Sequence, residues 1–293
     1  MNILSIFGRG VRLANKSTRI CLYLWLANLI FSALILAPVY FALAGDLSRS
    51  LSGDRLIGGF DLLVLGDLIY KYQSLLPATL GWLLVTSLVY FGLMIFLDGG
   101  MIGRILARES QEGKTNLALF FEDCGKYFFR FLRVFLISLV AFALVLGIFY
   151  RTVAGLFNLW TKSASTEWPS IFSSNLKTII FILLFSIVRM FFDYVKLGLA
   201  AGNSSRTLRA TVSTFSFLGR RFFRAWFLYI WVAVFYLLVT LAMLLLGKLL
   251  PERTPALLFV IFIGQQIFIL FRMWTRVLFV STEFHFLRAA KEP

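Results

Sequence analysis

Three charged residues share one face of a predicted membrane-spanning helix and are the first candidates for chemistry in this chain. Arg189, Asp193 and Lys196 recur at the spacing of an α-helical face. Asp193 can neutralise Arg189 and accept a hydrogen bond from Lys196. Charges inside a membrane are costly when unpaired, so they mark either a stabilising ion-pair network or the path of a polar substrate.

The last apolar stretch of the chain adds further polar groups. Arg272 and Arg276 lie near its C-terminal end, and Gln265 and Gln266 lie near its middle. The candidate intramembrane polar cluster is therefore Arg189, Asp193, Lys196, Arg272, Arg276, Gln265 and Gln266. It is either a structural clasp or part of a substrate site. We expect the clasp, because the charges can pair within the chain and no unmatched series of carboxyl groups suggests a proton relay.

Two basic segments are the second set of candidate residues. Apolar and basic side chains recur in each at helical spacing, as in helices that lie at a membrane interface. The candidate lipid or partner contacts in them are Lys126, Arg130, Arg133, Arg206, Arg209, Arg220, Arg221 and Arg224. We expect these bases to bind anionic headgroups in general. The alternative is that they dock a protein partner or recognise one particular lipid.

Enzyme motifs are missing from the sequence. It has no Gly-x4-Gly-Lys-[Ser/Thr] phosphate loop, no Gly-x-Ser-x-Gly elbow and no His-Glu-x-x-His zinc motif. The single histidine, His285, cannot by itself form a metal site. We therefore predict a protein that is not an enzyme and that has no cofactor or metal.

A repeated module positions these residues. An apolar stretch reaches Asp98 and is followed by Gly125-Lys126-Tyr127-Phe128-Phe129-Arg130. A second stretch reaches Asp193 and is followed, at nearly the same distance, by Gly219-Arg220-Arg221-Phe222-Phe223-Arg224. This similarity predicts an internal repeat of residues 78–157 and 176–247, in which pairs of helices are joined by amphipathic cytoplasmic segments.

Composition places the chain in a membrane. Hydrophobic residues make up 60% of it and charged residues 15%, with a mean hydropathy of +0.86, which is too apolar for a water-soluble protein. The apolar runs are continuous and do not alternate, so they predict helices and not a β-barrel. We predict an all-α polytopic membrane protein with a single domain, 1–293. Its six spans lie near 20–44, 78–97, 134–149, 176–198, 225–247 and 256–280.

The distribution of Lys and Arg predicts the orientation. These residues are concentrated before the first span and in segments 98–133 and 203–224, and they are sparse in the other connections. The positive-inside rule therefore predicts a multi-pass protein of the cell inner membrane with both termini in the cytoplasm. Because topology accounts for much of the net charge of +15, no nucleic-acid partner is expected.

Residues 189–234 carry a family resemblance. The stretch ends one apolar run with Asp193-Tyr194-Val195-Lys196 and leads through Gly219–Arg224 into the next. It resembles uncharacterised bacterial multi-span membrane proteins and the membrane domain attached to some glycerophosphodiester phosphodiesterases. The resemblance implies the six-helix architecture alone, because the phosphodiesterase domain is absent from this chain.

Three classes of function remain after this reasoning. We expect a non-enzymatic integral inner-membrane protein that acts through helix packing and through contact with a partner or with lipids, anionic ones on the cytoplasmic face. A homo-oligomer or another protein partner is compatible with this role. The alternative is a membrane permease or transport subunit with a polar site formed by the fourth and sixth spans. A lipid-modifying enzyme ranks third, because no nucleophile or acid–base pair is evident.

Overall fold

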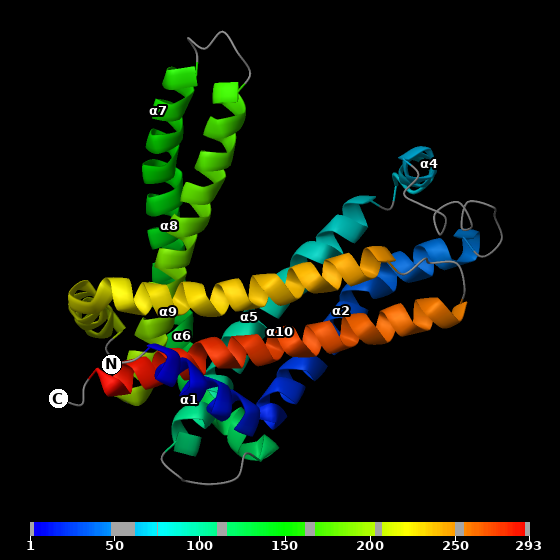
Figure 1. Cartoon of the computed structure of the whole chain (residues 1–293). Helices are drawn as coiled ribbons and strands as arrows, with labels where there is room; N and C mark the ends of the chain where they lie inside the picture. The colour runs from blue at the N-terminus through cyan, green and yellow to red at the C-terminus, as the bar shows by residue number, and fades with distance from the viewer. Residues whose placement is uncertain are drawn as a thin grey trace. The chain divides into compact units, whose positions relative to one another are not determined.

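The computed structural model consists of helices. It describes residues 3–47, 62–74, 76–109, 116–161, 168–202, 207–249 and 255–290, and these residues contain no β-strand. Figure 1 shows the helices, which are α1 (Ile3–Lys16), α2 (Thr18–Leu47), α4 (Leu62–Lys71), α5 (Leu76–Glu109), α6 (Leu117–Phe142), η1 (Ala143–Tyr150), α7 (Arg151–Thr161), α8 (Trp168–Ala201), α9 (Thr207–Leu249) and α10 (Pro255–Ala289). The predicted all-α class is confirmed.

Six helical segments are long and apolar enough to cross a membrane. They are Thr18–Phe41, Pro77–Arg108, Leu117–Leu159, Trp168–Ala201, Thr207–Lys248 and Leu257–Ala289. Each overlaps one predicted apolar stretch, so the chain is a polytopic membrane protein. Most segments are longer than predicted, because the amphipathic residues that flank an apolar stretch continue the same helix.

The third segment shows this extension most clearly. The prediction covered 134–149, whereas the helix starts at Leu117 with the basic segment and continues through α6, η1 and α7 to Thr161. Within it, η1 is a π-helical stretch of 8 residues, none of them buried. The basic segment is therefore the first part of a long helix.

The chain divides into two compact units. Unit 1 contains residues 1–16, 98–234 and 278–293, and unit 2 contains residues 17–97 and 235–277. Unit 1 therefore holds α1, α6, η1, α7 and α8 together with the end of α5, the first part of α9 and the end of α10. Unit 2 holds α2 and α4 with the remaining parts of α5, α9 and α10. Each unit is described separately below.

The main core of unit 1 joins four helices. Its buried apolar residues come from α1, α8, α9 and α10 and are Ile6, Met190, Tyr194, Leu218, Ala225, Leu228, Tyr229, Phe286 and Leu287. The amphipathic helix α1 packs closely on α10, because a Cβ atom built at Gly10 would overlap the side chain of Thr282. Glycine at this position therefore permits the close approach of α1.

A second core of unit 1 lies between α6 and α8. It contains Val134 of α6 and Val188, Phe192, Val195 and Leu199 of α8. Farther along α8, ring contacts join Phe142 to Phe185 and Tyr150 to Phe181. Figure 1 shows α7 and α8 side by side as a green pair. This pairing holds α8, which carries the predicted charges, against α6.

Unit 2 is held by aromatic and hydrogen-bond contacts between its spans. Tyr90 of α5 donates a hydrogen bond of 2.7 Å to the Asn28 side-chain oxygen of α2. Between α9 and α10, the ring of Phe235 contacts the rings of Phe271 and Trp274. Buried polar groups in a membrane helix are satisfied in this way by a neighbouring helix.

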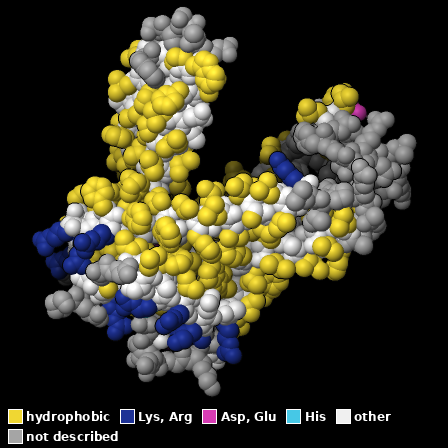
Figure 2. Space-filling view, viewed as in Figure 1, with side chains coloured by type: hydrophobic (Ala, Val, Ile, Leu, Met, Phe, Trp, Pro, Cys, Tyr) yellow, Lys and Arg dark blue, Asp and Glu magenta, His cyan; other side chains and the backbone are white. Residues whose placement is uncertain are grey.

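Large apolar side chains cover the outer faces of the spans. Figure 2 shows this for α7 and α8, whose visible surface is mainly hydrophobic. Exposed residues on these two helices include Leu156, Leu159, Ile171, Phe172, Ile179 and Ile182. A continuous apolar surface of this kind is costly in water and is favourable against lipid.

Candidate functional site

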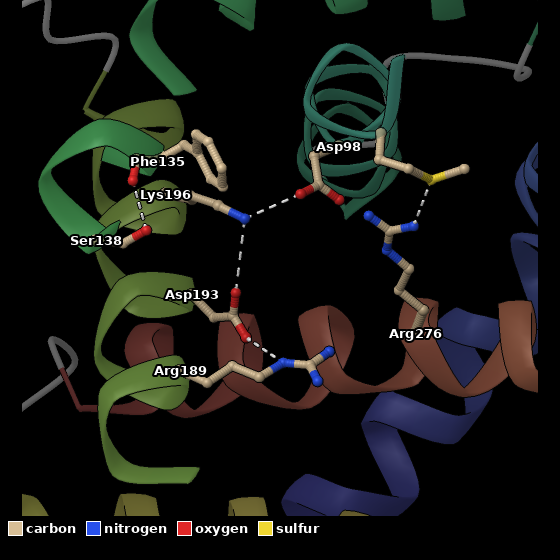
Figure 3. Close-up of polar contacts among 8 residues, drawn as sticks. Asp98, Phe135, Ser138, Arg189, Asp193, Lys196 and Arg276 are labelled. Carbon is tan, nitrogen blue, oxygen red and sulfur yellow. Dashed lines mark hydrogen bonds and ion pairs between the residues drawn. The ribbon is translucent and has the colours of Figure 1, made fainter. Parts of the chain in front are cut away.

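Lys196 of α8 lies between two aspartates. Its Nζ atom is 2.9 Å from Oδ2 of Asp98, on α5, and 3.8 Å from Oδ1 of Asp193, on the same helix as the lysine. Figure 3 shows the lysine amine directed between the two carboxyl groups. Asp98 and Asp193 occupy matching positions in the two copies of the predicted repeat. One cation therefore contacts both of these aspartates.

Arg189 extends the ion-pair network along α8. Its Nε atom is 4.0 Å from Oδ2 of Asp193, one helical turn away. The arginine side chain is about half exposed, so this contact is weaker than the Lys196–Asp98 pair. The structure thus brings together Arg189, Asp193 and Lys196, as their spacing predicts, and adds Asp98. The sequence already held an indication of this role, because Asp98 and Asp193 occupy matching places in the repeat.

Glu283 of α10 is the second residue that the sequence interpretation missed. It is 2% exposed, and neither of its carboxyl oxygens has a hydrogen bond or an ion pair among the described residues. It lies close enough to interact electrostatically with Asp193, Arg189 and Lys196. The predicted sixth span ended at residue 280, so Glu283 was placed outside the membrane. In the structure α10 continues to Ala289, and one carboxyl group near the cluster has no hydrogen-bond partner among the described residues.

Tyr194 adds an unsatisfied hydroxyl group to the same part of unit 1. The residue is fully buried, and its Oη atom has no hydrogen-bond partner in the described ranges. Its ring contacts the rings of Phe217 and Phe286. Tyr194 also interacts electrostatically with Glu283. Tyr194 and Glu283 are therefore two polar side chains of unit 1 that are buried near ion pairs and that lack hydrogen-bond partners among the described residues.

The other predicted cluster residues belong to unit 2. Arg276 donates a weak hydrogen bond of 3.2 Å to the sulfur of Met94, and Arg272 is exposed. Gln265 is exposed, whereas the side-chain oxygen of Gln266 is buried without a hydrogen bond from any described residue. The predicted seven-residue cluster is therefore divided between the two units. Only its α8 members form a network within unit 1.

The basic segment of α6 is attached to the core of unit 1. Phe120, Cys124 and Phe131 on its apolar face are buried. Its Asp123 forms an ion pair of 2.5 Å with Arg104 at the end of α5, and both side chains are largely buried. The predicted contact residues of this segment, Lys126, Arg130 and Arg133, lie on the remaining faces, where Lys126 and Arg133 are exposed.

The basic segment of α9 faces outward instead. Of its apolar residues, Leu208, Val212 and Phe215 are exposed, with Phe215 at 71%, whereas Leu218 is buried in the core of unit 1. The predicted contact residues Arg209, Arg220, Arg221 and Arg224 are exposed as well, whereas Arg206 lies outside the described residues.

A kink at Arg221 separates this segment from the rest of α9. The backbone angles there are φ −135° and ψ 22°, outside the helical range. In Figure 1 the first part of α9 is seen end-on while the rest runs lengthwise. The Arg221 guanidinium donates a hydrogen bond of 2.8 Å to the backbone oxygen of Ala290, just after α10. Residues 207–220 therefore form a separate amphipathic segment in front of the fifth span.

Comparisons with known proteins give no relative of this chain. No family model, curated protein or solved structure matches it. The family resemblance of residues 189–234 therefore stays a prediction from the sequence.

Proposed function

We propose that this multi-pass membrane protein is non-enzymatic and acts by binding anionic lipid headgroups at the cytoplasmic face of the inner membrane. The proposal rests on the exposure of apolar and basic side chains in segment 207–220 of α9 and at the kink that follows it. This segment presents Leu208, Val212 and Phe215 together with basic side chains to the outside, while its Leu218 packs into the core of unit 1.

The arrangement of the α9 segment fits a helix that lies in the membrane interface. Leu208, Val212 and Phe215 recur at helical spacing and are all exposed. In water this face would be unfavourable, whereas an interfacial helix buries such a face at the boundary between headgroups and acyl chains. The kink at Arg221 turns the chain from this segment into the apolar span that follows. The shape of α9 therefore supports a membrane surface as the occupant of this face.

The charges favour anionic lipids. Each Lys or Arg near an anionic surface contributes about 1 kcal/mol to binding. Besides the α9 arginines, the exposed face of α1 carries Arg9, Arg12 and Lys16. Figure 2 shows Lys and Arg side chains over both α1 and the first part of α9. Two separate elements of unit 1 thus offer basic groups, and the positive-inside rule places them toward the cytoplasm.

A lipid-binding experiment tests the proposal. The full-length protein is placed in nanodiscs of phosphatidylcholine with or without phosphatidylglycerol, and its melting temperature and the lipids that remain bound after gentle extraction are measured. We compare the wild type with Arg220→Gln/Arg224→Gln. The matched control is Arg151→Gln/Lys248→Gln, which removes two exposed basic residues from outside the basic segments.

The expected result is selective. Phosphatidylglycerol should raise the melting temperature of the wild type and of the control, and the α9 variant should lose most of this increase together with its bound phosphatidylglycerol. An equal response of all three proteins would contradict the proposal. If the α9 variant instead loses a co-purifying protein with its lipids unchanged, the surface docks a protein partner and not a lipid.

The second candidate function is a permease or transport subunit. It is favoured by the buried Glu283 next to the ion pairs of Lys196, which places polar groups of the fourth and sixth spans near one another in unit 1. Lys196→Gln separates this function from a structural clasp. If the ion pairs form a structural clasp, Lys196→Gln should be less stable than the wild type in the absence of any ligand. If they form a substrate site, the stability of Lys196→Gln without ligand should be close to that of the wild type, and the variant should lose the rise in melting temperature that a ligand causes.

A further inference from the structure

We propose that Glu283 is a proton-binding site: its carboxyl group carries a proton in the observed arrangement and gives it up when the ion pairs of α8 rearrange. This inference is independent of the lipid surface, because it concerns the interior of unit 1. It rests on the burial of Glu283, on its lack of partners and on the engagement of the nearby cations with other carboxylates.

Burial without a partner makes an ionised Glu283 unfavourable. The residue is 2% exposed, and both carboxyl oxygens lack a hydrogen bond or ion pair among the described residues. The effective cost of burying an unpaired charge is several kcal/mol, because neither water nor a counter-charge replaces its hydration. Protonation removes the charge and most of this cost.

The cations near Glu283 are engaged elsewhere. Lys196 is bound to Asp98 and Asp193, and Arg189 contacts Asp193. Both cations interact electrostatically with Glu283, but neither comes within ion-pair distance of it. The attraction of these cations for Glu283 is therefore opposed by the negative charge of Asp193.

Helices α8 and α9 also bring tyrosine hydroxyl groups near Glu283. Tyr194 of α8 and Tyr229 of α9 both interact electrostatically with it, and the Tyr194 hydroxyl group lacks a hydrogen-bond partner in the described part of the chain. Helix α1 contributes the contact of Gly10 with the neighbouring Thr282. On α10 itself His285 is buried two residues later, which is a different face of the helix.

A proton fits this site better than a metal ion does. Within the described ranges, no group of three or more His, Cys, Asp or Glu residues is placed to hold a metal ion. A proton needs no coordination shell and no cavity, only one carboxyl oxygen. Acidic side chains inside membrane helices also form the proton relays of pumps and transporters.

Release of the proton has a defined consequence for the ion pairs. The O–H bond of the Glu283 carboxyl group breaks, the proton passes to water, and a carboxylate remains. This carboxylate then competes with Asp193 for the same cations. Because the Arg189–Asp193 contact is long, at 4.0 Å, Arg189 is the cation that transfers most readily from Asp193 to Glu283. Loss of one proton thereby replaces the Arg189–Asp193 contact within α8 by an Arg189–Glu283 ion pair that joins α8 to α10.

Infrared spectroscopy of the full-length protein tests the proton site directly. A protonated carboxyl group has a carbonyl band that an ionised carboxylate lacks, and isotopic labelling with [13C]glutamate shifts this band only if it belongs to a glutamic acid. We compare the wild type, Glu283→Gln and the control Glu122→Gln, whose glutamate is exposed on α6. The spectra are recorded at neutral pH, where exposed glutamates are ionised.

The expected result is a [13C]glutamate-sensitive band in the wild type and in Glu122→Gln that is absent from Glu283→Gln. Asp193→Asn should weaken the band, because it frees Arg189 to pair with an ionised Glu283. The same band in Glu283→Gln, or no glutamate-sensitive band in the wild type, would overturn the proposal. The labelled wild type decides the question even if Glu283→Gln does not fold.

Discussion

The basic segments of α6 and α9 share one sequence motif but occupy different environments. In α6 the apolar face of the segment is buried, and Phe120 is fully inaccessible. In α9 the corresponding segment exposes Leu208, Val212 and Phe215 and ends at a kink. The motif therefore specifies an amphipathic helix before a span, and it does not specify whether that helix packs in the core or faces the membrane.

The preceding helix accounts for the difference. In α5 a Cβ atom built at Gly99, Gly100 or Gly103 would lie within 3.1 Å of residues in the α6 segment. In α8 the same construction at Gly198 finds only Thr214 of the α9 segment, at 3.6 Å, an ordinary van der Waals distance. Closely spaced glycines permit helices to approach until their backbones nearly touch. The α5 glycines therefore hold the α6 segment tightly, and the α8 glycine does not hold the α9 segment in this way.

Among the residues that the structure describes, an ion pair is found at the α5–α6 junction and not at the α8–α9 junction. Asp123 pairs with Arg104 at the α5–α6 junction. In the second copy the residue aligned with Asp123 is Phe217, which contacts the ring of Tyr194. The α6 segment is thus fixed by charge and close packing, and the α9 segment by aromatic contacts near its end. The difference leaves Leu208, Val212 and Phe215 of the α9 segment exposed, as the proposed lipid contact requires.

The largest effect should come from Asp123→Asn. The change leaves the largely buried Arg104 without its counter-charge, and breaking a buried ion pair typically costs about 3 kcal/mol or more. We expect the free energy of unfolding in detergent to fall by that order. Glu122→Gln, which neutralises the exposed neighbouring carboxylate, should leave it nearly unchanged. Equal effects of the two variants would show that the ion pair does not hold the α6 segment.

A smaller effect should distinguish the two sets of glycines. A Cβ atom in Gly100→Ala would lie 2.8 Å from the backbone oxygen of Phe120, so the helices must move apart at a cost of about 1–3 kcal/mol. Gly198→Ala meets no such obstacle and should be neutral or stabilise the helix by up to about 1 kcal/mol. Chemical unfolding of both variants in the same detergent measures the difference. Destabilisation by Gly198→Ala as large as that by Gly100→Ala would contradict the contrast between the junctions.

The two aspartates that share Lys196 should differ in their contribution to stability. Asp98→Asn removes the buried carboxylate that Lys196 contacts at 2.9 Å. We expect this loss to lower the free energy of unfolding by about 1.5–3 kcal/mol. Asp193→Asn affects contacts of 3.8 and 4.0 Å at a more exposed side chain and should cost less than about 1 kcal/mol. Thermal unfolding of the two variants tests this order. The reverse order would assign the main role in the network to Asp193.

Local patterns in the sequence predicted the elements of this protein well. Continuous apolar runs indicated six spans, because a membrane requires about 20 apolar residues per helix. The spacing of Arg189, Asp193 and Lys196 placed them on one face of a helix, where the structure pairs them. Helix ends were less predictable. The predicted sixth span ended at residue 280, whereas α10 continues to Ala289, and Glu283 was therefore not included among the candidate residues.

The sequence by itself determined the helical class, the six apolar segments and the positions of the charges on each helix, because these depend on periodicity within a single segment. Only the tertiary structure decided that Lys196 reaches Asp98 from another helix and that Glu283 is buried without a hydrogen-bond partner among the described residues. It also decided that the apolar face is buried in the α6 segment, whereas Leu208, Val212 and Phe215 are exposed in the α9 segment. These features depend on which helices approach closely. That approach is set by small residues and side-chain packing between segments far apart in the chain.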